Sequence, residues 1–257
     1  MILVVFLYAV FSAMTFINSS LMLTNPYPLL VGMFRALGSG SIIVLYMALF
    51  AKQKIRELHL SLSEWFWLIS YGVLIHSLGM CGFSYGVMFA NPVTVCFLYA
   101  SAPFLTAMLL YLYNGTALNK TKILGLCIGL IGLMPILLKS TNTHQEVAVM
   151  DKAWLGNGIV LISMIFFCLG WILFNRLIHS SSYPVQLLNG LAMIIGGVVS
   201  TLFVVMVYGM KVFELPISSN FTDLLTLFII SSLLTYSLYA YLLQTFSPTF
   251  ISFAGLS

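Results

Sequence analysis

Arg35 is the residue of this sequence whose type and place point most clearly to chemistry. It lies about a third of the way into an apolar run from Pro28 to Phe50, and that run is long enough to cross a bilayer as a helix. An arginine at membrane depth costs roughly 2.5–3.5 kcal/mol on insertion scales, so it should face a bundle interior or a wet cavity. We therefore expect Arg35 to point into a cavity, where it would attract a carboxylate or phosphate. The alternative is an arginine that reaches the interface or binds helix carbonyls.

Other polar side chains inside the apolar runs could supply hydrogen bonds to a substrate. The candidates that we select besides Arg35 are Asn18, His76, Tyr99, Asn189 and Gln244. The ordinary role of such residues is interhelical hydrogen bonding, worth about 0.6 kcal/mol on average. No Asp or Glu lies in the middle of an apolar run, so His76 is the only internal candidate for a titrating group. If the chain proves to be a carrier, exchange or facilitated diffusion is therefore at least as well supported as proton-coupled transport.

The sequence lacks the residue patterns of catalysis and of metal binding. All four cysteines lie inside apolar runs, and their spacing is not that of metal ligands. No ATP-binding P-loop is present, which argues against a primary pump. A membrane enzyme acting on lipids would need a cluster of His, Asp or Glu near one interface, and the sequence contains none. We predict no catalytic residue, no metal and no cofactor.

The elements that must position these residues are membrane-spanning helices. Of the 257 residues, 61% are hydrophobic and only 6% are charged, a composition that no soluble domain with a polar surface has. Eight apolar runs reach spanning length, and a ninth begins at Pro248. The eight runs cover approximately residues 1–23, 28–50, 65–89, 92–113, 121–139, 153–177, 184–209 and 224–246. The predicted fold class is an all-α membrane protein.

The distribution of positive charge predicts the orientation of the chain. With a cytoplasmic N-terminus, the inner connections hold six basic residues and the outer ones three, with Arg35 left out. The inner residues are Lys52, Lys54, Arg56, Lys120, Lys122 and Arg176. The outer residues are Lys139, Lys152 and Lys211. The positive-inside rule thus favours a multi-pass protein of the cytoplasmic membrane with its N-terminus inside. The net charge of +4 concerns this orientation and does not indicate nucleic-acid binding.

An internal repeat organises the runs into two units. An offset of 156 residues places Pro28 on Pro184 and Pro92 on Pro248. Five spans fit in each unit, and because five is odd, the second unit must cross the membrane in the opposite sense. We predict a first unit at residues 1–140 and an incomplete second unit at 153–257. On this reading the second unit would end near residue 295, so a ten-helix transporter is truncated here to about eight and a half spans.

Three motifs resemble the EamA domain of the drug/metabolite transporter superfamily. They are Tyr85-(x)4-Ala90-Asn91-Pro92-Val93, Ala100-Ser101-Ala102-Pro103-Phe104 and Gly125-(x)3-Gly129-(x)2-Gly132. The resemblance implies ten helices in two inverted five-helix units, with an arginine in the second helix, here Arg35. The family usually has a Glu where this sequence has Thr116. This departure puts in doubt a loop salt bridge, but not the fold.

The predicted function is secondary transport of a small polar metabolite by alternating access. An amino-acid-like or nucleotide-related compound, including the S-adenosylmethionine type, would fit an arginine beside aromatic side chains, and exchange would need no proton. The predicted partners are this small molecule and the lipid bilayer, without nucleic acid, and the protein would be a monomer or a homodimer. The alternatives are a non-transporting membrane scaffold and a lipid-modifying membrane enzyme.

Overall fold

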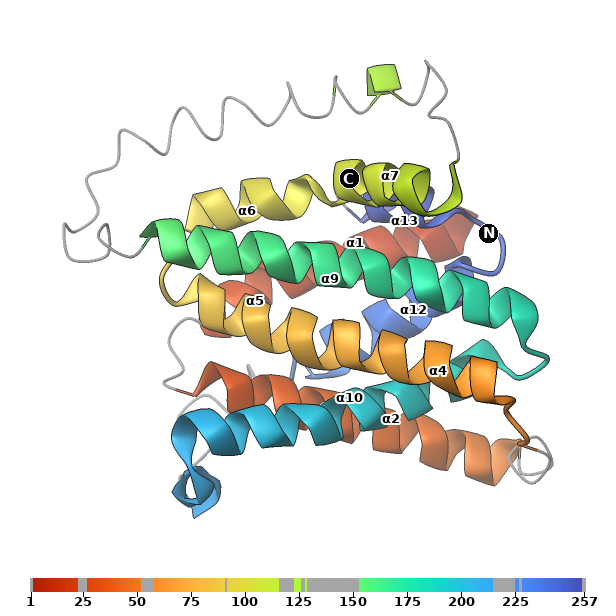
Figure 1. Cartoon of the computed structure of the whole chain (residues 1–257), viewed down its shortest axis with the longest axis horizontal. Coiled ribbons are helices and arrows are strands. Elements are labelled where there is room, and N and C mark those ends of the chain that lie inside the picture. Colours follow the sequence, from red (N-terminus) through yellow and green to blue (C-terminus); the bar gives the residue numbers. More distant parts are fainter. Residues whose placement is uncertain are drawn as a thin grey trace.

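Helices make up almost all of the chain that the computed structural model describes, and no strand occurs in that part (Figure 1). The described residues are 2–22, 27–51, 58–90, 92–115, 123–125, 128, 153–214, 225–226 and 228–255. The elements are α1 (Ile2–Met22), α2 (Pro28–Phe50), α4 (Leu62–Tyr71), η1 (Gly72–Gly79), α5 (Met80–Val87), α6 (Pro92–Ala100), α7 (Ala102–Asn114), α9 (Ala153–Ser180), α10 (Val185–Tyr208), η3 (Met210–Glu214), η4 (Phe228–Thr235), α12 (Tyr236–Leu242) and α13 (Pro248–Ala254). The segments η1 and η4 are π-helical. The all-α prediction is confirmed.

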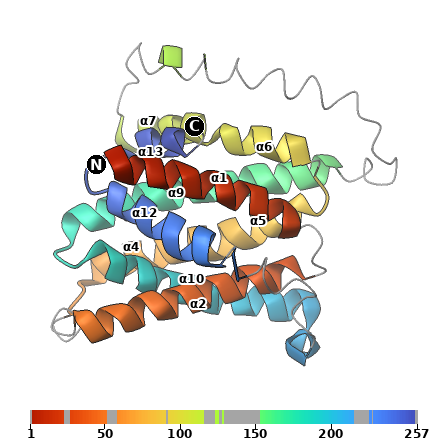
Figure 2. The ribbon, with the colours of Figure 1, turned by 180° about the vertical axis from the view of Figure 1, so that it is seen from behind.

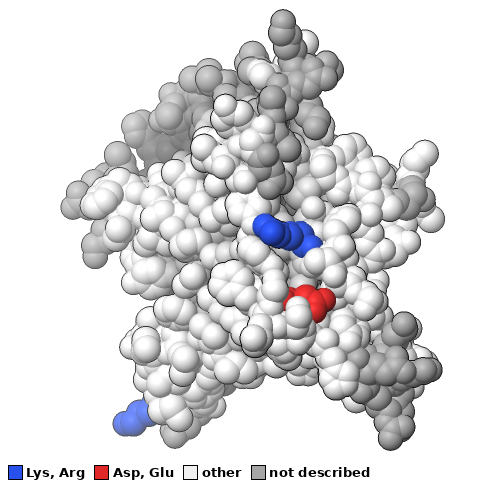
Figure 3. All heavy atoms as spheres, turned by 45° about the vertical axis from the view of Figure 1, so that its right-hand side comes forward, with Lys and Arg blue, Asp and Glu red and all other residues white. Residues whose placement is uncertain are grey.

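Four helices in the described part of the chain are long and apolar enough to cross a membrane. They are Pro28–Phe50, Leu62–Val87, Ala153–Ser180 and Val185–Tyr208. Large apolar side chains such as Leu45 and Leu202 are exposed on their outer faces, and charged side chains are sparse on the face in Figure 3. Exposed apolar surface of this extent suits contact with lipid tails, whereas a water-soluble surface would carry far more charge.

The predicted runs agree well with the helices, and prolines explain where helices begin. The run from Pro28 to Phe50 is α2 without change, and α13 begins at Pro248 as predicted. Proline is tolerated at these positions because the first N–H groups of a helix have no partner within it. The run over 92–113 is divided at Ser101 into α6 and α7, since Pro103 in the first turn of α7 cannot continue a helix from before it. The predicted run over 121–139 lies almost wholly outside the described residues.

The helices lie roughly side by side in a bundle, with α2 and α10 on one side and α6 and α7 on the opposite side (Figure 1). The continuous helix of α4, η1 and α5 lies between these sides with α9, and Figure 2 shows α1 and α12 from behind. A Cβ atom on Gly40 of α2 would come within 2.8 Å of the carbonyl oxygen of Gly190 on α10. The absence of a side chain at Gly40 thus lets the backbone of α10 approach α2 closely.

Aromatic stacking holds the interior of the bundle together. Tyr71 of α4 stacks on Phe174 of α9 with ring centroids 4.0 Å apart, and both side chains are fully buried. The hydroxyl of Tyr71 donates to Oδ1 of Asn189 on α10 at 2.7 Å. These contacts join three helices, so the buried hydroxyl is satisfied without water.

The 156-residue offset of the sequence also relates elements of the structure. Gly72–Gly79 (η1) and Phe228–Thr235 (η4) coincide residue for residue at this offset, and both are π-helical. The start of α2 falls on the residue before α10, and the colours of Figure 1 show these two helices running in opposite directions. The boundaries of the two units and the ten-helix arrangement remain predictions.

Candidate substrate cavity

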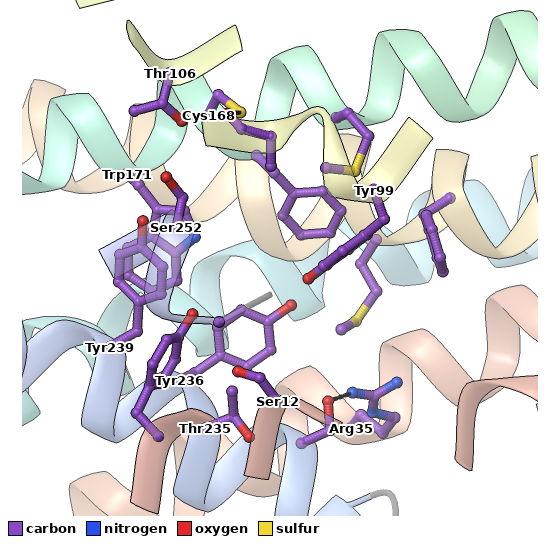
Figure 4. Close-up of a pocket in the computed structure, with 18 of the residues that line it drawn as sticks. Ser12, Arg35, Tyr99, Thr106, Cys168, Trp171, Thr235, Tyr236, Tyr239 and Ser252 are labelled. Carbon is purple, nitrogen blue, oxygen red and sulfur yellow. Dashed lines mark hydrogen bonds between the residues drawn. The ribbon is translucent and has the colours of Figure 1, made fainter. Parts of the chain in front are cut away.

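A cavity of about 120 Å³ lies inside the bundle, with walls from α1, α2, α5, α6, α7, α9, η4, α12 and α13 (Figure 4). One water molecule needs only about 10–15 Å³ on the same measure, so the space can hold several waters or part of a small ligand. The polar or ionisable lining residues are Tyr8, Ser12, Arg35, Ser84, Tyr99, Thr106, Cys168, Ser231, Thr235, Tyr236, Tyr239 and Ser252. The other lining residues are Met80, Phe83, Ala102, Met164, Phe167, Trp171 and Gly255.

Arg35 provides a fixed positive charge at one side of this cavity. Its side chain is 7% exposed, and Nε donates to Oγ of Ser232 at 3.0 Å while Nη2 donates to Oγ of Ser231. Both serines are neutral, so these hydrogen bonds hold the guanidinium in place without cancelling its charge. No Asp or Glu occurs among the described residues that line the cavity. An anionic group of a ligand that enters the cavity can accept charge-assisted hydrogen bonds from this guanidinium.

Trp171 of α9 forms an aromatic wall with two tyrosines of α12. Its ring stacks on Tyr239 at a centroid distance of 3.8 Å and an interplanar angle of 15°, and it lies nearly parallel to Tyr236 at 5.8 Å. Figure 4 shows Trp171 and Tyr239 across the cavity from Arg35. The face of an aromatic ring can stack on a planar ring of a ligand or attract a cation. The wall can thus bind a different part of a ligand from the part that Arg35 binds on the opposite side.

Hydroxyl groups line the cavity near both the charge and the aromatic wall. In Figure 4, Ser12 and Thr235 lie on the side of Arg35, Ser252 lies beside Trp171, and the hydroxyl end of Tyr99 points into the cavity. A hydroxyl can both donate and accept a hydrogen bond, and it can rotate to suit a ligand. The described lining thus offers one permanent cation, flat aromatic surface and adaptable hydrogen-bonding groups, but no carboxylate to serve as a general base.

The structure brings together two of the six site residues that the sequence predicted. Arg35 and Tyr99 both line the cavity. Asn189 lies on α10 away from the lining, where it is fully buried and accepts the hydrogen bond from Tyr71. Gln244 is exposed beyond the end of α12. The side chain of Asn18 lies outside the described part of α1.

His76, the remaining predicted site residue, lies directly behind the cavity wall. Its ring is fully buried, and it contacts Tyr236 edge-on at a centroid distance of 5.2 Å. Because Tyr236 lines the cavity and His76 does not, the tyrosine separates the imidazole from the cavity space. The substrate-binding roles of all six residues remain predictions.

Sequence reasoning did not select Trp171, Tyr236, Tyr239 or the serine pair of η4. In membrane helices aromatic residues face lipid and core alike, so residue type alone does not mark a lining position. A usable signal was present in the spacing of Tyr236 and Tyr239, since residues three apart share one face of a helix. The tandem Ser231-Ser232 also stands out in an apolar run, but its partner Arg35 is almost 200 positions away.

Apolar helices of spanning length around a cavity that holds a fixed charge define the class, a multi-pass membrane protein. Comparison with known proteins gives the family. Residues 1–138, more than half of the chain, match the EamA-like transporter family. The chain belongs to this family, as its motifs predicted.

Three curated relatives are named S-adenosylmethionine/S-adenosylhomocysteine transporter. The proteins of Chlamydia trachomatis serovars L2 and D are each 32% identical to this chain over 170 residues, which is 63% of this chain and 50% of the relative. The protein of Chlamydia muridarum is 29% identical over 167 residues, covering 63% and 51%. The chain spans about half the length of the curated relatives it matches.

The fold has a counterpart among solved structures. One crystal structure aligns over 99% of this chain and 83% of its own chain, with a TM-score of 0.71 and 13% sequence identity. At this identity the likeness concerns the fold alone.

Proposed function

We propose that this protein is a secondary transporter of a small polar metabolite and that S-adenosylmethionine and S-adenosylhomocysteine are the type of compound it exchanges. The observation that carries this proposal is the cavity with Arg35 on one side and the Trp171–Tyr239 stack on the other. A ligand that fits both must combine an anionic group with a planar ring. Membership of a transporter family supports a carrier rather than a scaffold or a lipid-modifying enzyme.

The chemistry of the proposed substrate matches the two ends of the cavity. The carboxylate of its amino-acid part would form charge-assisted hydrogen bonds with the guanidinium of Arg35. Its adenine would lie against the aromatic wall, and its ribose would meet hydroxyls such as those of Tyr99 and Ser12. The names of the three curated relatives support the same compound class.

The proposed mechanism is alternating access, in which the two units of the inverted repeat move against each other. The cavity lining is itself related by the 156-residue offset, because five pairs of lining residues fall on one another. These pairs are Tyr8 with Met164, Ser12 with Cys168, Met80 with Tyr236, Phe83 with Tyr239, and Tyr99 with Gly255. Such pairing supports a site between two equivalent units, where inverted-repeat carriers bind their substrates. In our proposal, ten helices in two five-helix units would alternate around this site.

Exchange is the proposed mode of transport. The described lining contains Arg35, whose charge is permanent, but no carboxylate and no histidine that could carry a proton across. Exchange of one metabolite for its demethylated product needs no such group. The same proposal places the protein in the cytoplasmic membrane with its N-terminus inside, on the charge distribution of the connections.

The test is exchange by the full chain in proteoliposomes. Vesicles loaded with unlabelled S-adenosylhomocysteine are expected to take up external labelled S-adenosylmethionine, and empty vesicles are expected to take up little. Methionine lacks the ring and adenosine lacks the carboxylate, so each should compete weakly. Absence of exchange by folded protein with every compound of this panel would contradict the proposed function. If methionine alone competes strongly, the aromatic wall is not part of the substrate site.

A further inference from the structure

His76 is an internal polar group to which the described structure gives no polar partner. Its ring is 0% exposed, and neither Nδ1 nor Nε2 has a hydrogen-bond partner among the described residues. The ring contacts are aromatic, with Tyr71 at a centroid distance of 5.5 Å and Tyr236 at 5.2 Å. A neutral imidazole carries one donor and one acceptor, and burying both without partners costs free energy. At zero exposure no water-sized space touches the ring, so the cost is not relieved by solvent in this state.

The repeat gives His76 a counterpart with a defined role. At the 156-residue offset His76 falls on Ser232, at the same position of the second π-helical segment. Ser232 accepts the hydrogen bond from Nε of Arg35 at 3.0 Å, and its neighbour Ser231 lines the cavity. The same helical position thus holds Arg35, a lining residue, in one unit and contacts Tyr236, another lining residue, in the other, while neither Ser232 nor His76 lines the cavity itself.

The cavity lining is asymmetric with respect to η4 and its counterpart η1. Ser231 and Thr235 of η4 line it, whereas their counterparts Ile75 and Gly79 of η1 do not. The η1 backbone lies tightly against α10, because a Cβ atom on Gly196 would come within 2.3 Å of the carbonyl oxygen of Gly72. In an inverted-repeat carrier the two units move against each other around a fixed site, so a corner closed in one state is expected to open in the other.

We propose that His76 is a substrate-contacting residue in the opposite-facing state of this carrier and that Tyr236 covers it in the state described here. The inference rests on the proposed alternating-access function. Tyr236 both lines the cavity and contacts the imidazole, so a shift of this ring relative to η1 would bring His76 to the cavity. A neutral imidazole can donate to one polar atom of a metabolite and accept from another. The partners that His76 lacks here would then be supplied by the substrate.

The first experiment measures whether His76 reaches the cavity during transport. Cys81, Cys96, Cys127 and Cys168 are replaced by alanine, and single cysteines are introduced as His76→Cys, Thr235→Cys and Ala192→Cys. Thr235 lines the cavity in the present state, whereas Ala192 is as fully buried as His76 and lies on α10. A water-soluble methanethiosulfonate is applied to vesicles that exchange S-adenosylhomocysteine, with and without saturating substrate.

We expect the Thr235→Cys and His76→Cys thiols to react and saturating substrate to slow the reaction of His76→Cys. The Ala192→Cys thiol should stay unreactive. The inference is overturned if His76→Cys is as unreactive as Ala192→Cys in vesicles that carry out exchange. Absence of exchange in the parent chain is a different result, because it contradicts the proposed function itself.

A second pair of variants covers the case in which His76→Cys does not fold. His76→Gln keeps one donor and one acceptor, whereas His76→Phe keeps an aromatic ring against Tyr71 and Tyr236. A substrate-contacting role predicts that His76→Gln retains exchange and that His76→Phe raises KM by about tenfold, the equivalent of one lost hydrogen bond. A packing role predicts the reverse order, since the aromatic contacts would then matter most. That reverse order, measured per amount of folded protein, would refute the inference.

Discussion

Replacing Arg35 tests the centre of the proposed site. Arg35→Gln removes the positive charge but keeps a polar side chain beside Ser231 and Ser232, which accept its hydrogen bonds. Arg35→Lys keeps the charge and loses the planar fork that can contact two acceptors at once. Arg35→Gln removes a charge from membrane depth and Arg35→Lys adds none, so both variants should still reach the membrane.

The expected magnitude follows from the contacts of the guanidinium. A hydrogen bond to a charged group contributes about 1.5–3 kcal/mol, which corresponds to a loss of roughly 10- to 150-fold in affinity for an anionic substrate. Arg35→Gln should therefore raise the KM for exchange by at least roughly 10- to 150-fold, or abolish exchange. Arg35→Lys should lie between the parent and Arg35→Gln, since it retains the attraction but loses the fork geometry.

The assay is S-adenosylmethionine/S-adenosylhomocysteine exchange in proteoliposomes, normalised to folded protein. Arg176→Gln is the matched control, because Arg176 is exposed and contacts the Trp67 ring at 4.7 Å and the hydroxyl of Tyr113 at 2.8 Å, away from the cavity. It should exchange as the parent does. If Arg35→Gln exchanges as well as Arg176→Gln, then Arg35 serves only to tie α2 to η4 and our placement of the site is wrong.

Three further predictions concern packing, the aromatic wall and a helix cap. Gly196→Ala should lower the unfolding free energy by about 1–3 kcal/mol, because its Cβ atom would lie 2.3 Å from the carbonyl oxygen of Gly72; thermal unfolding in detergent measures this. Trp171→Ala should weaken competition by adenosine about tenfold and leave competition by methionine almost unchanged. Ser61→Ala should cost about 0.5–2 kcal/mol of stability through the lost capping box at the start of α4, without a change in exchange KM.

Each of these predictions has its own contradicting result. Gly158→Ala is the control for packing, since a Cβ atom at Gly158 would meet open space, and equal melting temperatures for the two glycine variants would refute the close approach of α10 to η1. Equal loss of methionine and adenosine competition in Trp171→Ala would mean that the tryptophan shapes the bundle rather than the ring site. A Ser61→Ala variant with altered KM but parental stability would contradict a purely capping role.

The sequence by itself determined the class of protein and much of the helix layout. Hydropathy predicts spans because a backbone in lipid must satisfy its own hydrogen bonds, so an apolar run of sufficient length has to be a helix. Helix starts at Pro28 and Pro248 follow from local chemistry, since proline lacks the N–H that a helix interior requires. The cost of a lone charge likewise predicted that Arg35 would be buried beside a cavity.

The tertiary structure decided which polar side chains share that cavity. Asn189 and Gln244 are as polar as Tyr236 and Tyr99, yet only the two tyrosines line it. The facing direction of a helix can be predicted when one face is polar, but these helices are apolar on nearly all sides because lipid surrounds the bundle.

The rotation of each helix is instead set by contacts between distant residues. The approach of Gly40 to Gly190 fixes α2 against α10, and the bond from Arg35 to Ser232 joins α2 to η4. Such pairs are separated by 150 residues or more, so no local pattern predicts them. The composition of the cavity therefore follows from packing between the two halves of the chain, which only the folded bundle brings together.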